Sequence, residues 1–488
     1  MEKIIGRKKE TAILEKLYKS RNAEFLAVYG RRRIGKTFLI TEFFKDSSVY
    51  FEVTGSKQAN KAEQLTNFYR EFVALFKPEA EYGVPKNWSE AFHQLKEAIA
   101  AINSSQKILL FFDELPWLAS PKSGFLQALD YFWNRHASRM PNVFLIICGS
   151  AASWMIKKVI YNRGGLYGRL SAEMRLQPFS LSEVEEFFRS RRITLSRKQI
   201  VEVYMVTGGV PKYLTYVESG KSSAQIINAL CFAPQSPLLK EFHILYDSLF
   251  DDAYKHVKIV RALADKRHGC TQQELFEAAD LPVGGRSGEL LRKLEESGFI
   301  ITRQSYGKQI RERKFQLVDE YSLFYLYWID SIKHSILQGT DQDYWSKIQT
   351  TPQWHSWAGL AFENICFKHV GKIKEALGIG GVSTRESHWR YVPQKRTKEQ
   401  EGERGAEIDL VIDRADDCIN LCEIKFYNSV YTMTKQDAED IERKKTIFRE
   451  QTHTKKTLFV TLITPYGTKE NNHYLSCVNN QLTLDALF

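Results

Sequence analysis

The chain has 488 residues, of which 43% are hydrophobic and 26% charged, a composition typical of a folded protein rather than a disordered one. This length exceeds one compact core, so we expect three or four domains of roughly 100–200 residues. The net charge of +11 favours a polyanionic partner, for which nucleic acid, DNA in particular, is our hypothesis. The alternative is a mildly basic protein without such a partner.

The cysteines and the hydropathy pattern exclude several classes of protein. The seven cysteines are scattered without a CxxC pair, so neither a disulfide framework nor a zinc ribbon is predicted. The N-terminal residues lack the apolar core of a signal peptide, and no run of about 18 apolar residues exists. We therefore expect a cytoplasmic protein without a membrane partner. The sequence leaves open whether the chain forms a homo-oligomer.

The first part of the chain alternates buried strands with helices. The predicted strands and helices are, in chain order, 25–29, 38–44, 88–102, 108–112, 125–136 and 143–148. Strands that alternate with helices predict an α/β domain with a parallel sheet over residues 1–178. Residues 179–250 lose the strand pattern, and we expect them to form a helical domain.

A glycine-rich loop between the first strand and the first helix fits the pattern G-x-x-x-x-G-K-[ST]. Its glycines let backbone N–H groups point at phosphates, and the following helix adds the positive end of its dipole. Lys36 is expected to reach the β- and γ-phosphates, and Thr37 to bind Mg²⁺. The predicted ATP-binding residues of this loop are Gly30, Arg31, Arg32, Arg33, Ile34, Gly35, Lys36 and Thr37.

Carboxylates follow the second predicted strand, where a magnesium ligand is expected. We predict that Asp113 holds Mg²⁺ and that Glu114 polarises the water that attacks ATP. Ser150, after the third predicted strand, could sense the γ-phosphate; a helix cap is the alternative. Arg169 could stabilise transferred charge, or it could be an ordinary solvated arginine.

These motifs together resemble the archaeal-type ATPase family, within the AAA+/STAND group of P-loop NTPases, over about residues 1–250. The resemblance rests on Gly6-Arg7 with Glu10 and Leu14, on Tyr29–Thr37, on Phe112–Trp117, on Leu166–Arg169 and on Thr207–Tyr213. It implies an ATP-driven conformational switch. It also implies that residues 179–250 form a lid, whose Gly209–Pro211 segment, with Pro211 at the nucleotide, senses what is bound.

Residues 251–335 have the element order of a winged helix: helices at 257–264, 272–279 and 286–297, then strands at 299–304 and 314–318. The third helix carries Arg286, Arg292 and Lys293. The strand pair and its loop carry Arg303, Lys308, Arg311, Arg313 and Lys314. Such a basic wing suits contacts with DNA phosphates. A purely structural winged helix that packs domains together is the alternative.

The last part of the chain, residues 345–488, brings acidic residues and a lysine onto neighbouring strands. Asp409 lies in a strand at 408–412, and Glu423 and Lys425 lie in or directly after a strand at 419–424. Residues two apart share one strand face, so these three side chains should converge. Two carboxylates can hold Mg²⁺, and a lysine beside them can position or deprotonate a water.

This constellation resembles the PD-(D/E)xK nuclease superfamily over about residues 355–462, with Glu363 on an upstream helix completing the metal shell. The predicted metal ligands are Thr37 and Asp113 for the ATP site and Glu363, Asp409 and Glu423 for the nuclease-like site. The predicted catalytic residues are Glu114, Asp409, Glu423 and Lys425. The sequence therefore favours an ATPase with a Mg²⁺-dependent nuclease domain; the alternative is a regulatory ATPase that binds DNA or protein without cutting.

Overall fold

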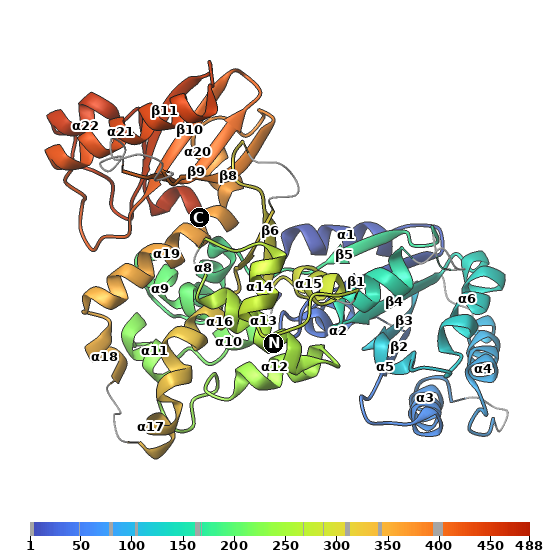
Figure 1. The fold of residues 1–488 in the computed structure, drawn as a ribbon. Helices are drawn as coiled ribbons and strands as arrows, with labels where there is room; N and C mark the ends of the chain where they lie inside the picture. Colours follow the sequence, from blue (N-terminus) through green and yellow to red (C-terminus); the bar gives the residue numbers. More distant parts are fainter. Residues whose placement is uncertain are drawn as a thin grey trace. The chain divides into compact units, whose positions relative to one another are not determined.

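The structure is a computed structural model of the chain. It describes residues 4–47, 49–77, 82–102, 106–161, 166, 168–266, 268–285, 287–307, 313–339, 344–393 and 404–488. The chain divides into two compact units (Figure 1). The first comprises the chain up to Pro178 together with Ser248–Asp251, and the second comprises Phe179–Asp247 and Asp252–Phe488.

The first unit is built around a five-stranded, all-parallel sheet with the strand order β2-β3-β4-β1-β5. The strands are β1 (Glu24–Tyr29), β2 (Val49–Thr54), β3 (Ile108–Asp113), β4 (Val143–Gly149) and β5 (Ala172–Arg175). The helices are α1 (Lys8–Tyr18), α2 (Lys36–Phe44), α3 (Lys61–Phe76), α4 (Trp88–Ala101), α5 (Leu115–Leu118), α6 (Phe125–Arg135) and α7 (Ala152–Met155), with one-turn segments at Ala137–Arg139 and Ile156–Ile160.

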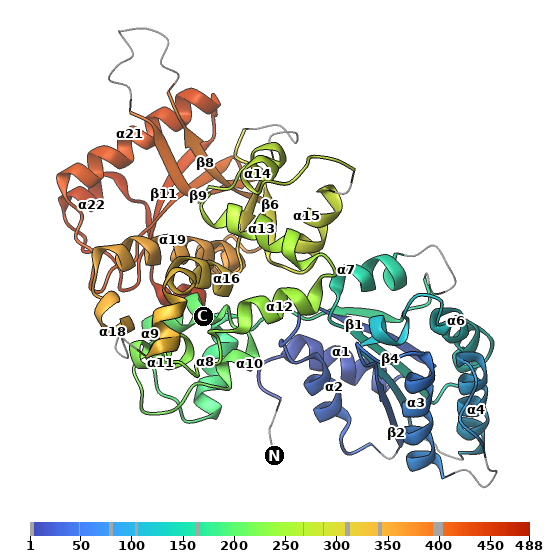
Figure 2. The ribbon, with the colours of Figure 1, turned by 60° about the horizontal axis from the view of Figure 1, so that its bottom comes forward.

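Helices cover both faces of this sheet because its central strands are apolar on both sides. In β1, Phe25 and Ala27 pack with α3, α4 and α6, whereas Leu26 and Val28 pack with α1 and α2. Figure 2 shows α1 and α2 on one side of the strands and the other three helices on the opposite side. The result is a three-layer α/β/α core around a parallel sheet, as the α/β prediction expected.

The second unit begins with helices and a small sheet. The helices are α8 (Leu181–Ser190), α9 (Arg197–Thr207), α10 (Pro211–Leu214), α11 (Ser223–Cys231), α12 (Glu241–Leu249), α13 (Ala253–Ala264), α14 (Gln272–Ala278) and α15 (Ser287–Glu296). A two-stranded antiparallel sheet follows, formed by β6 (Ile300–Arg303) and β7 (Lys314–Leu317). Three helices before a strand pair match the predicted element order, but the winged-helix assignment itself stays a proposal.

The second unit continues into a mixed five-stranded sheet with the order β12-β11-β10-β9-β8. Its strands are β8 (Thr384–Tyr391), β9 (Ala406–Arg414), β10 (Cys418–Ile424), β11 (Thr457–Ile463) and β12 (Asn480–Leu482). The helices of this part are α16 (Glu320–Phe324), α17 (Lys333–Gln338), α18 (Tyr344–Ile348), α19 (Pro352–Lys368), α20 (Val370–Ala376), α21 (Lys435–Thr452) and α22 (Asn472–Cys477), with one-turn segments at Tyr325–Ile329, Asp330–Ile332 and Leu484–Leu487.

Pro234 and Pro237 separate α11 from α12, because they lack the N–H donors that a continuing helix needs. Helix α19 ends at His369, and α20 begins directly after it. Within the described ranges, the structure contains no helix that is both long and apolar enough to cross a membrane.

Candidate nucleotide and metal sites

The loop between β1 and α2 is shaped by its glycines. Gly30 has φ 147° and Gly35 has φ 84°, conformations that other L-residues rarely adopt. A Cβ on Gly30 would lie 2.5 Å from the carbonyl oxygen of Leu176, so a side chain there would displace the backbone. Gly35 directly precedes Lys36, the first residue of α2, so the loop leads into the positive end of that helix.

Arg7 holds this loop from outside the motif. Its buried guanidinium donates one hydrogen bond to the Ile34 carbonyl (3.0 Å) and another to the Gln177 carbonyl (2.8 Å). A charged donor with two carbonyl acceptors fixes the loop relative to the segment after β5. The Gly6-Arg7 pair contributed to the family resemblance, but the sequence alone gave Arg7 no structural role.

The predicted magnesium and phosphate ligands lie together in the first unit. The Thr37 hydroxyl donates to Asp113 Oδ2 at 2.6 Å, which places two oxygen ligands at one point. The Lys36 ammonium donates to the Arg31 carbonyl at 3.0 Å, within the loop where phosphates would lie. Because oxygen ligands suit Mg²⁺ and the lysine suits phosphate, these residues fit Mg²⁺ with ATP.

Ser150 contacts Glu114 because of the strand order. The strand β4 lies between β1 and β3, so the residue after β4 lies between the phosphate loop and the carboxylates after β3. The Ser150 hydroxyl donates to Glu114 Oε2 at 2.8 Å, and its backbone N–H donates to the same oxygen at 3.3 Å. Ser150, the residue that we expected to sense the γ-phosphate, therefore holds Glu114, the residue that we expected to polarise the attacking water.

The other predicted ATP-binding residues occupy varied positions. Arg31 is buried, Arg33 has a φ of 71°, and the Arg32 guanidinium lies 5.7 Å from the ring centroid of Trp117. Arg169 is exposed before β5. Pro211 lies in the second unit, at the start of α10. The roles of these residues at the nucleotide stay predictions.

Part of the sequence matches a known family. Residues 4–217, which include most of the first unit and the start of the second, match a family described as an ATPase domain predominantly from Archaea. This segment is similar to that family.

Relatives of the chain include an uncharacterized protein of Methanocaldococcus jannaschii, 23% identical over 412 residues, which are 83% of this chain and 83% of that protein. An uncharacterized ATP-binding protein of the same organism is 38% identical over 45 residues, 9% of this chain and 76% of that protein. Among solved structures, a Walker-type ATPase of Pyrococcus abyssi has a TM-score of 0.48 and 18% identity, covering 66% of this chain and 96% of that one. The ORC2 protein of Aeropyrum pernix has a TM-score of 0.42 and 16% identity, covering 69% and 95%.

Beyond the ATPase domain match, the second unit gathers acidic side chains between β9 and β10. In this antiparallel pair Leu410 pairs with Cys422, so Asp409 and Glu423 are the next residues on each strand and lie side by side. Asp409 Oδ2 accepts a hydrogen bond from the Ile424 backbone N–H at 2.7 Å. Glu363, on α19, lines the same cavity as Asp409.

The charges of these carboxylates raise one another's pKa. Burial raises the pKa of Glu363, and the nearby Asp409 and Glu423 charges raise it further. The pKa of Glu423 is raised by burial and then by Asp409. Burial likewise raises the pKa of Asp409, and Lys425 opposes the rise for all three carboxyl groups. Three such groups at one place are costly as anions unless a cation joins them.

Lys444 is a member of this cluster that sequence analysis missed. Its ammonium lies 2.7 Å from Glu423 Oε2 and 3.6 Å from Asp440 Oδ2. It belongs to α21, whose buried residues include Ile441 and Phe448. Lys444 is three residues after the first of these and four before the second, so helical spacing puts it on the buried face. That spacing is the signal by which the sequence could have identified it.

Basic and aromatic side chains lie beside the carboxylate cluster. A cavity of about 200 Å³ is lined by Glu363, Asp409, Arg303 and Lys314, among others. The Arg303 guanidinium lies 3.8 Å from the ring centroid of Phe367. Burial lowers the pKa of Arg303 to about 10, so the guanidinium stays charged at neutral pH. A cavity lined by both carboxylates and cationic side chains suits a metal ion together with a phosphate group.

The β6–β7 strand pair packs against the C-terminal sheet. The Tyr306 backbone N–H donates to the His388 carbonyl at 3.1 Å, and the Tyr306 ring lies 5.1 Å from the Phe448 ring. Gln316 donates to Asn364 at 3.4 Å. These contacts, together with the packing of half-buried Arg303 on Phe367, use part of the predicted DNA-binding wing for internal packing. Of the other predicted basic residues, Arg286, Lys308 and Arg311 lie outside the described residues.

Proposed function

We propose that the chain is an ATP-controlled enzyme that acts on nucleic acid, with a Mg²⁺-dependent nuclease site in its second unit. One observation supports the nuclease proposal: Glu363 and Asp409 line one cavity, and Asp409 lies beside Glu423, although the three residues come from α19, β9 and β10. The Lys425 charge lowers the pKa of all three carboxyl groups. A chance surface E-x-K pair would have no reason to gather two further carboxylates around it.

The chemistry of the cluster suits phosphodiester hydrolysis. Mg²⁺ prefers oxygen ligands, and the carboxylates of Glu363, Asp409 and Glu423 supply them. When bound, the ion would polarise a phosphoryl oxygen and favour ionisation of a water. Lys425 would orient that water or stabilise the charge that develops on the phosphate. Arg303 and Lys314 would bind the neighbouring negative charge of the substrate.

In the ATPase domain, the proposed chemistry uses Lys36, Thr37, Asp113 and Glu114. Lys36 binds the β- and γ-phosphates, and Thr37 with Asp113 holds Mg²⁺. Glu114 polarises the attacking water once it leaves its hydrogen bonds to Ser150. The Ser150–Glu114 contact therefore supports a role for Ser150 in linking the state of the nucleotide to the position of Glu114.

A second candidate function is a regulatory ATPase that binds DNA or protein without cutting. The ion pair between Lys444 and Glu423 favours it, because the ammonium already neutralises one proposed metal ligand. The internal packing of Tyr306 and Arg303 favours a structural role for the β6–β7 pair. DNA contact would then depend on other basic residues, of which Arg313 is exposed.

The nuclease proposal predicts that the full chain cleaves nucleic acid in Mg²⁺ and not in EDTA. The measurement is a gel assay of single-stranded DNA, duplex DNA and RNA, each labelled at one end and incubated with ATP. We expect cleavage of at least one of these substrates. Binding of DNA with no cleavage of any of them in Mg²⁺ or Mn²⁺ would favour the regulatory ATPase.

A further inference from the structure

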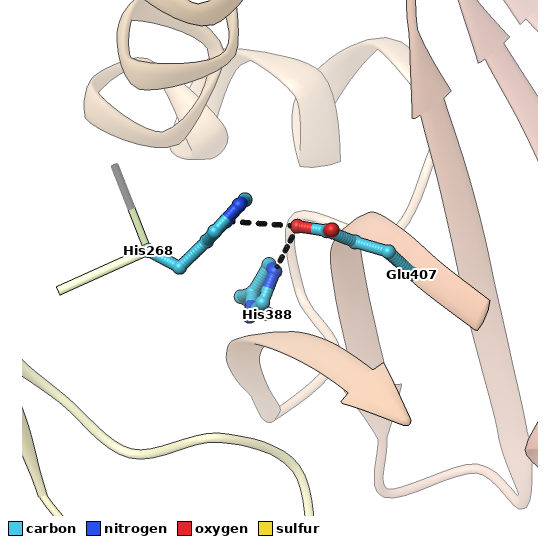
Figure 3. A group of neighbouring side chains, drawn as sticks. All are labelled: His268, His388 and Glu407. Atoms are coloured by element: carbon cyan, nitrogen blue, oxygen red, sulfur yellow. Dashed lines mark hydrogen bonds and ion pairs between the residues drawn. The ribbon is translucent and has the colours of Figure 1, made fainter. Parts of the chain in front are cut away.

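A second cluster of metal-binding side chains lies beside the carboxylate site. Figure 3 shows the imidazoles of His268 and His388 directed at the carboxylate of Glu407. His268 Nδ1 lies 2.9 Å and His388 Nε2 lies 2.8 Å from the same oxygen, Glu407 Oε1. One ligand atom from each residue can be chosen so that all three lie within 4.8 Å of one another.

We propose that His268, His388 and Glu407 bind a divalent transition-metal ion of the zinc class. Two imidazole nitrogens and one carboxylate oxygen form a donor set that Zn²⁺ accepts, with a fourth position left for water or substrate. Mg²⁺ prefers oxygen ligands and keeps several of its waters, so this set discriminates against it. The proposal does not depend on the nuclease function.

The geometry needs only small side-chain movements to accept the ion. Ligand atoms about 2.1 Å from a tetrahedral ion lie about 3.4 Å apart, a little farther than the two hydrogen-bonded distances observed. The side chains of His268, His388 and Glu407 are 32%, 19% and 33% exposed, so an ion can reach them from solvent. These three side chains are also buried enough for the neighbouring groups to restrain their orientations.

The three ligands come from distant parts of the second unit. His268 lies between α13 and α14, His388 lies in β8, and Glu407 lies in β9. The strands β8 and β9 are paired neighbours, which fixes two of the ligands relative to each other. The His388 carbonyl also accepts the hydrogen bond from Tyr306, after β6. A bound ion would therefore link the segment between α13 and α14 to the C-terminal sheet, through His268 on one side and His388 and Glu407 on the other.

The proposed ion would lie close to the carboxylate cluster without sharing its ligands. Glu407 precedes Asp409 by two residues on β9, and its charge raises the pKa of Glu363. His268 and His388 line the same cavity as Glu363 and Asp409. An open coordination position would therefore be accessible from the cavity in which we propose that a phosphate binds.

The test measures the binding of Zn²⁺ alone to the metal-free full chain by calorimetry and by metal content after dialysis. We expect one tight site in the wild type, and affinity lower by about a hundredfold or more in His268→Ala and in Glu407→Gln. His355→Ala, which changes an exposed histidine of α19, is the matched control and should bind normally. Circular dichroism spectra check that each variant is folded.

Asp409→Ala separates this site from the nuclease site, because it should keep the Zn²⁺ site whether or not cleavage is lost. Unchanged Zn²⁺ affinity in folded His268→Ala and Glu407→Gln would overturn the proposal, as would the absence of a tight site in the wild type. In both cases the three residues would form a hydrogen-bonded group only. Loss of the Zn²⁺ site in Asp409→Ala alone would assign the ion to the carboxylate cluster instead.

Discussion

Lys36→Ala is expected to abolish ATP hydrolysis and to weaken nucleotide binding. The Lys36 ammonium is buried within the phosphate loop, where it donates to the Arg31 carbonyl and would meet the β- and γ-phosphates. Removing one preorganised charge from such a site lowers kcat by about 10²–10³-fold. The measurement is steady-state phosphate release by the purified full chain, with nucleotide affinity from a fluorescent ATP analogue.

Lys45→Ala is the matched control for this prediction. Lys45 caps the end of the same helix, α2, where its ammonium pairs with Glu42 at the surface. An exposed ion pair contributes little, so this variant should hydrolyse ATP at the wild-type rate. Full hydrolysis by Lys36→Ala would show that the loop is not the catalytic nucleotide site. Glu114→Gln should separate the two functions, because it keeps binding and stops turnover.

Asp409→Ala is expected to remove Mg²⁺-dependent cleavage of nucleic acid while leaving ATP hydrolysis largely intact. Asp409 lies beside Glu423 on the neighbouring strand, and both belong to the second unit, whereas the phosphate loop belongs to the first. Charge stabilisation by a bound metal is worth several kcal/mol, so loss of a ligand should bring cleavage to background. Both activities are measured on the same preparation.

Asp413→Ala serves as the control on the same strand. Asp413 is half-buried near the end of β9 and pairs with Lys456 at 2.7 Å. Its loss removes a peripheral ion pair and should leave cleavage unchanged. Lys425→Ala should resemble Asp409→Ala, because the Lys425 charge opposes the rise in pKa of all three carboxyl groups. If Asp409→Ala and Lys425→Ala cleave as fast as the wild type, the proposed nuclease site is wrong.

Much of the ATPase domain could be predicted because its signals are local. The phosphate loop is one continuous segment, and β1, β3 and β4 are buried on both faces, so apart from Glu24 and Asp113 at strand ends their sequences are mostly apolar. The strands β2 and β5 were not predicted. In β2 buried and half-buried residues alternate at the sheet edge, and β5 is a four-residue strand, Ala172–Arg175, with one buried side chain.

The remaining interactions depend on tertiary structure. Arg7 reaches the loop from 27 residues away, and Lys444 reaches Glu423 across 21 residues. His268 meets Glu407 only because the segment before α14 packs beside β8 and β9. No short sequence motif encodes contacts between residues that lie this far apart in the chain. The neighbouring positions of Asp409 and Glu423 could be predicted, because both residues lie in strands that the sequence indicates. The role of Lys425 stays a prediction.

The dependence of cleavage on the bound nucleotide tests ATP control most directly. Cleavage rates of the wild type are measured at saturating Mg²⁺ with ATP, with ADP, with a non-hydrolysable ATP analogue and without nucleotide, and again for Lys36→Ala. The proposal predicts rates that differ by about tenfold or more between nucleotide states in the wild type, and by much less in Lys36→Ala. Equal wild-type rates in all four conditions would contradict ATP control of the second unit.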